Sequence, residues 1–162
     1  MSQQTPKGGK IINIASAAAR SASDNTSYCA AKAAIVHLTR SLAMQLGGSN
    51  INVNSISPGV VMTPLVAAYP IEFRQRLRDI TPAGYIARPQ DISGPVLFLA
   101  SSASDFVAGH DLLMDGGRTL STWIDPLERH TPPRVSIEDE SIDMKLDLAD
   151  LGVDFDENGV PR

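Results

Sequence analysis

Short apolar runs alternate with longer segments of helical spacing along the first 118 residues. Three runs are short and rich in branched apolar residues, which is typical of buried strands; they cover residues 10–15, 51–56 and 110–114. Three longer segments favour helices; they cover residues 28–46, 70–79 and 90–101. Strands that alternate with helices in this way predict an α/β fold around a parallel sheet.

The longest predicted helix has recognisable signals at both ends. Residues 24–27, Asp-Asn-Thr-Ser, supply side chains that cap a helix N-terminus. Gly47 and Gly48 are expected to end the helix, because glycine readily adopts the left-handed conformation that stops helices. The apolar residues at helical spacing, which should face the core, are Ala31, Ile35, Leu38, Leu42 and Leu46.

Two shorter predicted helices contain residues that constrain them. Asp91 suits the first turn of the last helix, and Pro95 fits only near its start, because an interior proline costs about 3 kcal/mol. Arg74, Arg76 and Arg78 resemble a basic patch, but on a helix positions 74 and 78 share a face and position 76 does not. We therefore interpret the three arginines as a solvated helix surface and expect no nucleic-acid partner.

The composition is that of an ordinary folded domain. The 162 residues are 43% hydrophobic and 20% charged, so the chain is not wholly disordered. A single cysteine, Cys29, excludes an internal disulfide and a cysteine-based zinc cluster. The polar first residues lack a secretory apolar segment, and no apolar run approaches the roughly 20 residues of a membrane span. These features predict a cytoplasmic protein without a membrane partner.

Charge divides the chain near residue 118. Residues 1–118 carry 10 Lys/Arg and 7 Asp/Glu, whereas residues 119–162 carry 4 Lys/Arg and 11 Asp/Glu. We therefore predict a folded domain over residues 1–118 and an acidic, poorly ordered extension over residues 119–162. Residues 142–151 could form a short amphipathic helix in that extension, and an acidic arm that docks on a basic partner is the alternative interpretation.

Candidate chemistry lies at the carboxyl ends of the predicted strands, where open α/β sheets bind ligands. Ser16 follows the first strand, and Tyr28 and Lys32 share one helix face. A phenol in water has a pKa of about 10, and a neighbouring ammonium stabilises the phenolate, which makes such a pair a general acid or base. A serine hydroxyl nearby could hold a carbonyl or alcohol oxygen. The spacing alone also suits an ordinary amphipathic helix.

Four segments in the same order together resemble the short-chain dehydrogenase/reductase family. They read G-G-K-I-I-N-I-A-S, then Y-C-A-A-K-A-A-I-V-H-L-T-R-S-L-A, then I-N-V-N-S-I-S-P-G-V-V-M-T-P, and finally P-A-G-Y-I-A-R-P-Q-D-I-S-G-P-V-L-F-L-A-S-S-A-S-D-F-V-A-G-H-D-L-L-M-D-G-G. The resemblance covers about residues 8–118. It implies a Rossmann-like, doubly wound parallel sheet and an NAD(P)-dependent oxidoreductase. Such an enzyme interconverts a small-molecule carbonyl and a secondary alcohol by hydride transfer.

The resemblance also assigns roles to catalytic residues. Ser16 matches the serine that orients the substrate, and Tyr28 matches the tyrosine that acts as acid or base. Lys32 matches the lysine that lowers the pKa of the family's tyrosine and holds the nicotinamide ribose.

A second group of residues matches the family's cofactor-binding turn. Val61 and Thr63 match positions that contact the nicotinamide end of the cofactor, and Pro58 and Gly59 shape that turn. Residues 64–85 match the family's substrate lid; its apolar residues are Val66, Tyr69, Ile71 and Phe73.

Part of the family pattern is missing from this sequence. No G-x-G-x-x-G or T-G-x-x-x-G-x-G occurs, and neither does the N-N-A-G strand or the residue that selects NAD from NADP. The chain therefore resembles the last three strands of a seven-stranded sheet, an N-terminally truncated form of the fold. We expect weakened binding of NADP or NAD, with NADP favoured on family frequency, and an exposed edge on the first strand.

Three interpretations remain open. The chain is an NAD(P)-dependent oxidoreductase, or a truncated, inactive family member that associates with intact subunits, or an interaction protein that works through its acidic extension. The helix over residues 28–46 could support homo- or hetero-oligomers, because its family counterpart often lies in a subunit interface. Within it, we interpret Cys29 as a small buried apolar residue and His37 as a core or interface residue.

Overall fold

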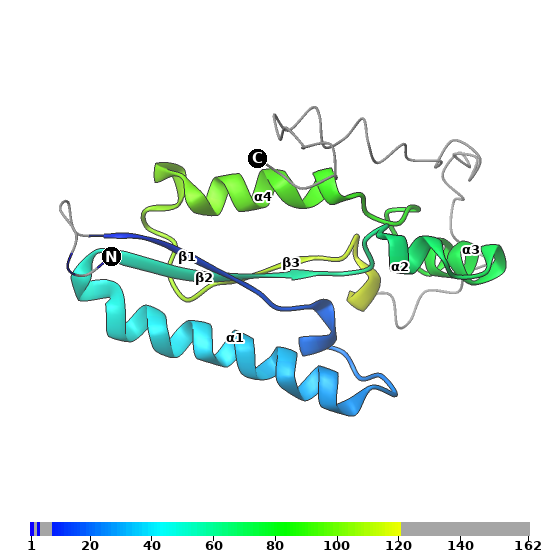
Figure 1. Ribbon diagram of the computed structural model, residues 1–162, viewed down its shortest axis with the longest axis horizontal. Coiled ribbons are helices and arrows are strands. Elements are labelled where there is room, and N and C mark those ends of the chain that lie inside the picture. Colours follow the sequence, from blue (N-terminus) through cyan, green and yellow to red (C-terminus); the bar gives the residue numbers. More distant parts are fainter. Residues whose placement is uncertain (2, 4–7, 121–162) are drawn as a thin grey trace, which may run out of the picture. The chain divides into compact units, whose positions relative to one another are not determined.

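The computed structural model describes residues 1, 3 and 8–120 (Figure 1). Three strands lie within this range, namely β1 (Gly9–Ile14), β2 (Ile51–Pro58) and β3 (Asp111–Met114). The α-helices of the same range are α1 (Thr26–Leu46), α2 (Pro64–Ala67), α3 (Ile71–Asp79) and α4 (Pro89–Ala100). The predicted alternation of strands and helices is confirmed, with boundaries that differ by no more than two residues.

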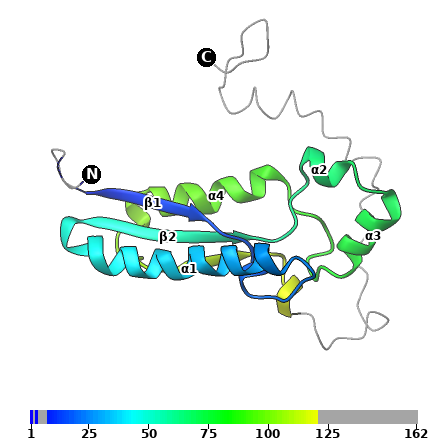
Figure 2. The same cartoon turned by 60° about the horizontal axis from the view of Figure 1, so that its bottom comes forward.

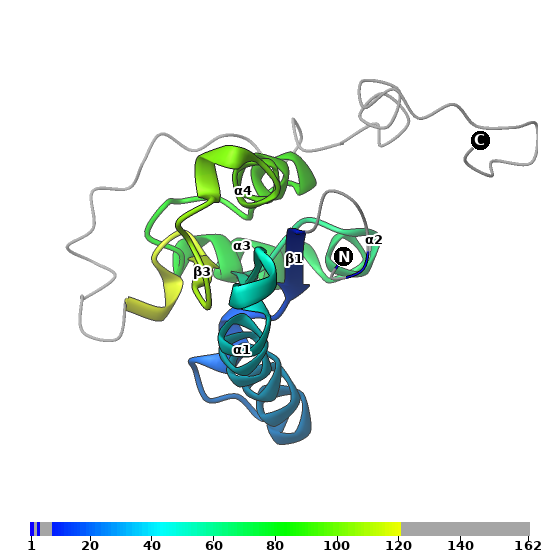
Figure 3. The same ribbon diagram turned by 90° about the vertical axis from the view of Figure 1, so that its left-hand side faces the viewer.

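The three strands form a parallel sheet in the order β1-β2-β3. Helix α1 packs on one face of this sheet and α4 on the opposite face, so the described part has three layers (Figures 1 and 3). Strand β1 pairs only with β2 among the described strands and is therefore an edge strand, as expected. The α/β class and the parallel sheet are both confirmed.

The centre of the core lies along β2, which both layers of helices cover. Val53 and Ile56 are fully buried, and Leu99 contributes from α4. Each such side chain contributes about 1.5–3 kcal/mol when it is removed from water. On the α1 side, Ala43 packs with Ile51 and Val53. The apolar residues Ile51, Val53 and Ile56 made β2 recognisable from the sequence, although polar residues of the same strand are buried too.

Helix α1 begins where its capping residues predict but ends differently. The Asn25 side chain accepts a hydrogen bond from the Tyr28 N–H at 3.2 Å and caps the helix N-terminus. The predicted left-handed stop at the glycines is wrong, because Gly47 has φ −56° and continues the helical turn. A 3₁₀ turn over Gly47–Ser49 follows, and Asn50 supplies the left-handed residue, with φ 57°. Asparagine tolerates this conformation because its short side chain is polar.

The inward face of α1 is also rotated from the predicted one. Thr39 and Ala43 are buried, whereas Leu38, which we expected in the core, is 52% exposed. Thr39 is accommodated because its hydroxyl donates to the Ile35 carbonyl and accepts from Asn13 Nδ2, both at 2.9 Å. His37 is exposed, so it is not a core residue, and its alternative interpretation as an interface residue stays a prediction. The small side chains on this face let α1 approach the sheet closely, and larger apolar residues of the helix are exposed instead.

Two expectations about the shorter helices are also wrong. Pro95 lies in the middle of α4 rather than near its start. It has no N–H to donate to the carbonyl of Asp91, so one bond of the helix is missing. Arg78 is 7% exposed and lies on the buried face of α3 beside Leu77, so it is not part of a solvated surface. Arg76 is exposed, as its position on the opposite face predicts.

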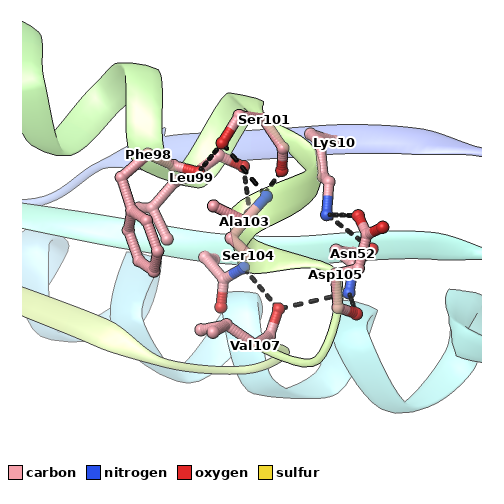
Figure 4. A network of polar contacts seen from close by, with 10 residues as sticks. Lys10, Asn52, Phe98, Leu99, Ser101, Ala103, Ser104, Asp105 and Val107 are labelled. Carbon is pink, nitrogen blue, oxygen red and sulfur yellow. Dashed lines mark hydrogen bonds and ion pairs between the residues drawn. The ribbon is translucent and has the colours of Figure 1, made fainter.

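A polar network joins the amino ends of β1 and β2 to the turn after α4 (Figure 4). Lys10 Nζ lies 2.7 Å from Asp105 Oδ1 and 3.1 Å from Asn52 Oδ1. The Asn52 side-chain amide donates to the carbonyls of Asp105, at 2.9 Å, and Val107, at 3.2 Å. This network fixes the end of the sheet that lies away from the predicted site.

Replacing Asn52 by alanine is expected to lower the free energy of unfolding by about 1–3 kcal/mol. The loss follows because two carbonyls and the Lys10 ammonium lose a partner in a partly buried place. Urea unfolding followed by circular dichroism measures it. Gln90→Ala, at an exposed position of α4, is the control and should change stability by less than about 0.5 kcal/mol. Equal effects of the two substitutions would contradict the role of the network.

The predicted acidic extension lies almost wholly outside the described residues. The proposed helix over residues 142–151 and the domain boundary near residue 118 therefore stay predictions. Within residues 1, 3 and 8–120, no helix is both long enough and apolar enough to cross a membrane.

Candidate functional site

The predicted site residues lie around the carboxyl ends of β1 and β2. These two strands run parallel and in register from Gly9 opposite Ile51 to Ile14 opposite Ile56. Just beyond this point, the Ala15 N–H donates to the Ile56 carbonyl at 2.8 Å. The residues that follow each strand therefore leave the sheet at one edge, which is where ligands bind in open α/β folds.

Ser16 begins a short 3₁₀ turn over Ala17–Ala19. Its hydroxyl oxygen accepts a hydrogen bond from the Ala18 N–H at 3.2 Å and caps this turn. A cavity of about 400 Å³ opens beside Ser16, and Pro58 and Gly59 line it from the end of β2. Ser21, Ser23, Arg118 and Thr119 line the same cavity. The structure thus brings Ser16 together with the first two residues of the predicted cofactor turn.

Tyr28 and Lys32 form a pair in the first two turns of α1. The Lys32 Nζ lies 5.6 Å from the centroid of the Tyr28 ring, over its face. It also donates to the carbonyl of Ile14, the last residue of β1, at 3.1 Å. Tyr28 is 43% exposed. The ammonium therefore connects the phenol-bearing helix to the strand end that leads into Ser16, although neither Tyr28 nor Lys32 lines the cavity.

The turn after β2 is held from two sides. The Gly59 N–H donates to the Met114 carbonyl of β3 at 2.8 Å. Val61 forms a parallel bridge with Ala87, made by Met62 N–H to the Ala87 carbonyl at 2.7 Å and by Ala87 N–H to the Val60 carbonyl at 3.2 Å. In a parallel bridge of this kind the central residue points its own N–H to the other side. The Val61 N–H is therefore directed away from Ala87.

Thr63 caps α2, since its hydroxyl oxygen accepts from the Val66 N–H at 3.5 Å. The threonine hydroxyl keeps its proton for donation to another group. Helices α2 and α3 follow and lie beyond the carboxyl end of β2 (Figure 2). Tyr69 and Phe73 pack edge to face there, with ring centroids 5.2 Å apart. This part of the expected substrate lid is thus an apolar cluster.

Gly59 allows the turn to approach β3 closely. A Cβ at this position would lie 2.8 Å from Asp115 Cα and 2.9 Å from Asp115 Cβ. Asp115 cannot retreat easily, because its carboxylate accepts hydrogen bonds from the Gly117 N–H at 2.9 Å and from the Thr119 N–H at 2.7 Å. Gly116 and Gly117 have φ values of 62° and 83° and form the turn that follows β3.

We expect Gly59→Ala to destabilise the protein by about 1–3 kcal/mol, because the added methyl group meets backbone atoms. Thermal unfolding measures the loss. Gly47→Ala is the matched control: nothing lies within 4 Å of its Cβ, and its φ is ordinary. That substitution should be neutral or stabilising by about 0.4–1 kcal/mol. If both variants unfold like the wild type, the close approach at Gly59 is not tight.

The sequence analysis missed a buried carboxylate behind the site. Asp111 is 4% exposed, and its Oδ1 accepts from Ser55 Oγ at 2.7 Å and from Ser57 Oγ at 2.8 Å. Its Oδ2 accepts from Arg20, with Nε at 3.0 Å and Nη2 at 2.8 Å. Two serines at alternate positions of β2 were the available signal, because residues i and i+2 share one side of a strand.

The environment of Asp111 predicts how stability changes with pH. Burial alone would raise the pKa of this carboxyl. Hydrogen bonds from Ser55, Ser57 and Arg20, together with the charge of Arg20, lower the pKa by more than burial raises it. The pKa in the folded protein is therefore below that of the unfolded chain. This contribution to stability is complete above the unfolded pKa and is lost as the pH falls through the folded pKa.

The free energy of unfolding should thus lose this contribution below about pH 4. Urea unfolding over a series of pH values measures the effect. In Asp111→Asn the corresponding part of the acid dependence should disappear. An identical acid dependence in both proteins would contradict the assignment.

Among residues 1, 3 and 8–120, no cluster of three or more His, Cys, Asp or Glu side chains could hold a metal ion. Cys29 is only partly buried, and its Sγ lies 3.2 Å from Ser23 Oγ. The donors that are present match the sequence expectation for the nicotinamide end of a cofactor: the Lys32 ammonium is expected to hold the ribose, and the outward Val61 N–H and the Thr63 hydroxyl are expected to contact the nicotinamide. Because the turn packs closely against Asp115, position 59 has room only for glycine, and no side chain projects from the turn there.

Residues 1–119 match the family model described as enoyl-(acyl carrier protein) reductase. Over 115 residues the chain is 43% identical to the NAD-dependent glycerol dehydrogenase of Listeria innocua, covering 70% of this chain and 45% of that one. It is 42% identical over 112 residues to the 7α-hydroxysteroid dehydrogenase of Escherichia coli, covering 68% and 44% of the two chains. The chain therefore spans about half the length of the relatives that it matches.

Solved structures give the same result. A gluconate 5-dehydrogenase from Burkholderia cenocepacia in complex with NADP and tartrate superposes with a TM-score of 0.67 at 34% identity, covering 72% of this chain and 47% of that chain. A 7α-hydroxysteroid dehydrogenase complexed with NADH and 7-oxo glycochenodeoxycholic acid has a TM-score of 0.66 at 41% identity, covering 70% and 45%.

Proposed function

Because the chain belongs to the short-chain dehydrogenase/reductase family, we propose that it contributes to an NAD(P)-dependent oxidoreductase that interconverts a carbonyl and a secondary alcohol. One observation carries the proposal: the Lys32 ammonium lies over the Tyr28 ring and binds the end of the strand that leads into Ser16. A proton donor, a cation and a hydroxyl at one edge of the sheet are the groups that such a reaction needs.

Each of the three groups has a distinct task in this proposal. The Ser16 hydroxyl binds the substrate oxygen and holds it near the phenol. Tyr28 Oη gives its proton to that oxygen during reduction and takes a proton from the alcohol during oxidation. The Lys32 ammonium stabilises the negative charge that develops on Tyr28 Oη, and its position beside the ring suits that role.

The nicotinamide end of the cofactor would be held by Lys32, the Val61 N–H and the Thr63 hydroxyl, with Pro58 and Gly59 forming the turn. When bound, the cofactor supplies or accepts the hydride. The relatives include proteins described with NAD, NADH and NADP, so both cofactors belong in the test, although the sequence analysis favours NADP.

Binding of a shortened form of the cofactor gives the sharpest test. The proposed contacts involve only the nicotinamide and its ribose, so reduced nicotinamide mononucleotide should bind about as tightly as NADH or NADPH. Titration of the purified chain, followed by the fluorescence of the reduced nicotinamide, measures all three affinities. Lys32→Met should weaken them, and Asn52→Ala, at the opposite end of the sheet, should not. Absence of binding up to millimolar concentrations would contradict the proposal for this chain.

The substrate class is best sought among the compounds that relatives are named for. Polyols, a sugar acid and a hydroxysteroid represent the range, and we propose glycerol, gluconate and a 7α-hydroxysteroid as first probes. The apolar pair Tyr69 and Phe73 favours a ligand with an apolar part. Turnover of the steroid but not of the polyols would support that preference.

We also propose that the chain assembles with a partner of the same family. Strand β1 is an edge strand among the described strands, and Leu38 and Met44 on α1 are 52% and 81% exposed. Light scattering after size-exclusion chromatography tests this, and Leu38→Glu should reduce the assembled fraction. A monomer at all concentrations, both alone and after mixing with an intact protein of the family, would contradict it. The cytoplasmic location expected from the sequence stays a prediction.

A further inference from the structure

We infer that Arg20 is a positioning residue, whose ion pair with Asp111 fixes the loop that carries Ser16 against the sheet. The inference deepens the proposed function and rests on it only where Ser16 is given its role toward substrate. The juxtaposition itself is structural: Arg20 follows β1, and Asp111 begins β3, at the far edge of the described sheet.

Three hydrogen bonds join Arg20 to Asp111, although the Arg20 side chain is partly exposed. Both Nε and Nη2 of Arg20 donate to Asp111 Oδ2, and Nη2 also donates to the Asp111 backbone carbonyl at 2.7 Å. The Asp111 side chain is 1% exposed, and that of Arg20 is 43% exposed. Three hydrogen bonds from one planar group restrict its orientation, which a single ammonium would not do.

Strand β2 provides the base on which this pair rests. Ser55 and Ser57 are completely buried, and both hydroxyls donate to Asp111 Oδ1. All the partners that hold the carboxylate therefore belong to rigid elements or to Arg20. Buried polar groups of this kind are costly unless every partner is present, so the cluster has one favoured arrangement.

The other contacts of the loop are weaker or local: the 3₁₀ turn packs against α1, Ser21 Oγ donates to the Ala17 carbonyl at 3.3 Å, and Ser23 Oγ lies 3.2 Å from Cys29 Sγ. Residues 17–23 read Ala-Ala-Ala-Arg-Ser-Ala-Ser, and Ala17 is their one buried apolar side chain. At its start, Ala15 is bonded to β2, and Ser16 caps the 3₁₀ turn. At the end of that turn, the Arg20 N–H donates to the Ala17 carbonyl at 2.9 Å. The Arg20 side chain thus ties the far end of the Ser16 turn to the sheet.

Hydrogen–deuterium exchange of the full chain tests the inference without reference to activity. In Arg20→Met, exchange of the peptide over residues 15–23 should rise about ten-fold relative to the wild type. Arg20→Lys keeps the charge but makes fewer hydrogen bonds. Its exchange over residues 15–23 should therefore lie between that of the wild type and that of Arg20→Met. Lys10→Met is the matched control, because it removes an ion pair at the opposite end of the sheet. It should leave residues 15–23 unchanged.

Two results would overturn the inference. One is unchanged protection of residues 15–23 in Arg20→Met, and the other is an equal rise in Lys10→Met, which would indicate general destabilisation. If Arg20→Met does not fold, the comparison of Arg20→Lys with the wild type decides: no local increase in exchange overturns the proposal.

Kinetics then separate positioning from a purely structural role. Where the wild type turns over a probe substrate, Arg20→Met should lower kcat by about 10- to 100-fold and leave the KM for NAD(P)H nearly unchanged. In a Ser16→Ala background the same change should have no further effect on kcat. An equal fall in both backgrounds would overturn the link to Ser16. If the wild type itself is inactive, the proposed function fails, whereas the exchange experiment still tests the loop.

Discussion

Replacing Tyr28 by phenylalanine is expected to lower kcat by about 10²–10⁴-fold, because the substitution removes the one proton that the proposed reaction transfers through a side chain. The aromatic ring remains and can still pack beneath the Lys32 ammonium. The binding of the nicotinamide end should therefore change little. Steady-state kinetics with a probe substrate, together with the fluorescence titration, separates the two effects.

The neighbouring cysteine provides the control for this prediction. Cys29 lies next to Tyr28 in α1, and Cys29→Ser keeps the contact with Ser23 Oγ possible. Its kcat should stay within about two-fold of the wild type, because surface and near-surface changes of this kind rarely alter the fold. A Tyr28→Phe variant with nearly normal kcat would contradict the role of the phenol, whatever the result for Cys29.

Replacing Asp111 by alanine is expected to lower the free energy of unfolding by about 3 kcal/mol. The Ser55 and Ser57 hydroxyls are completely buried and lose their acceptor, and water cannot easily replace it. The loss of the partner costs less free energy at Arg20, because its partly exposed guanidinium can be solvated by water. Urea unfolding at neutral pH measures the difference.

An exposed acidic residue in a second described ion pair serves as the comparison. The side chain of Asp105 is 70% exposed and pairs with Lys10. An exposed pair contributes about 0–1 kcal/mol, so Asp105→Ala should have a much smaller effect. If Asp111→Ala were no more destabilising than Asp105→Ala, the buried cluster would not hold the sheet as described.

The sheet and its helices were predictable because their signals are local. Strand β2 carries Ile51, Val53 and Ile56 within a short segment that both helix layers cover, and Asn25 lies in the predicted capping cluster. The details that failed depend on contacts distant in sequence. Leu38 was expected inside because it repeats at helical spacing, but the small residue Ala43 and the bonded Thr39 occupy the buried face instead. Periodicity predicts that the segment is a helix, but the sheet surface on which the helix packs decides which of its faces is buried.

The site could be predicted only in part, for a similar reason. Ser16, Tyr28 and Lys32 were candidates from their positions and spacing, and the family resemblance gave them their expected roles, but the contact between Lys32 and Ile14 was not foreseeable from spacing. Asp111 was missed because its partners come from positions 20, 55 and 57, which no local pattern connects. Arg78 illustrates the same limit, because a charged residue is buried only where the fold supplies the surroundings.

The bridge between Val61 and Ala87 has a consequence for how this protein can change over evolution. It brings together the two ends of the segment that contains α2 and α3, so that segment begins and finishes at neighbouring points. Closing a longer loop costs little, since each doubling of its length adds only about 0.6 kcal/mol. The segment can therefore lengthen or vary at small cost while Tyr28, Lys32 and the sheet keep their geometry, and under the proposed function such variation would change substrate preference.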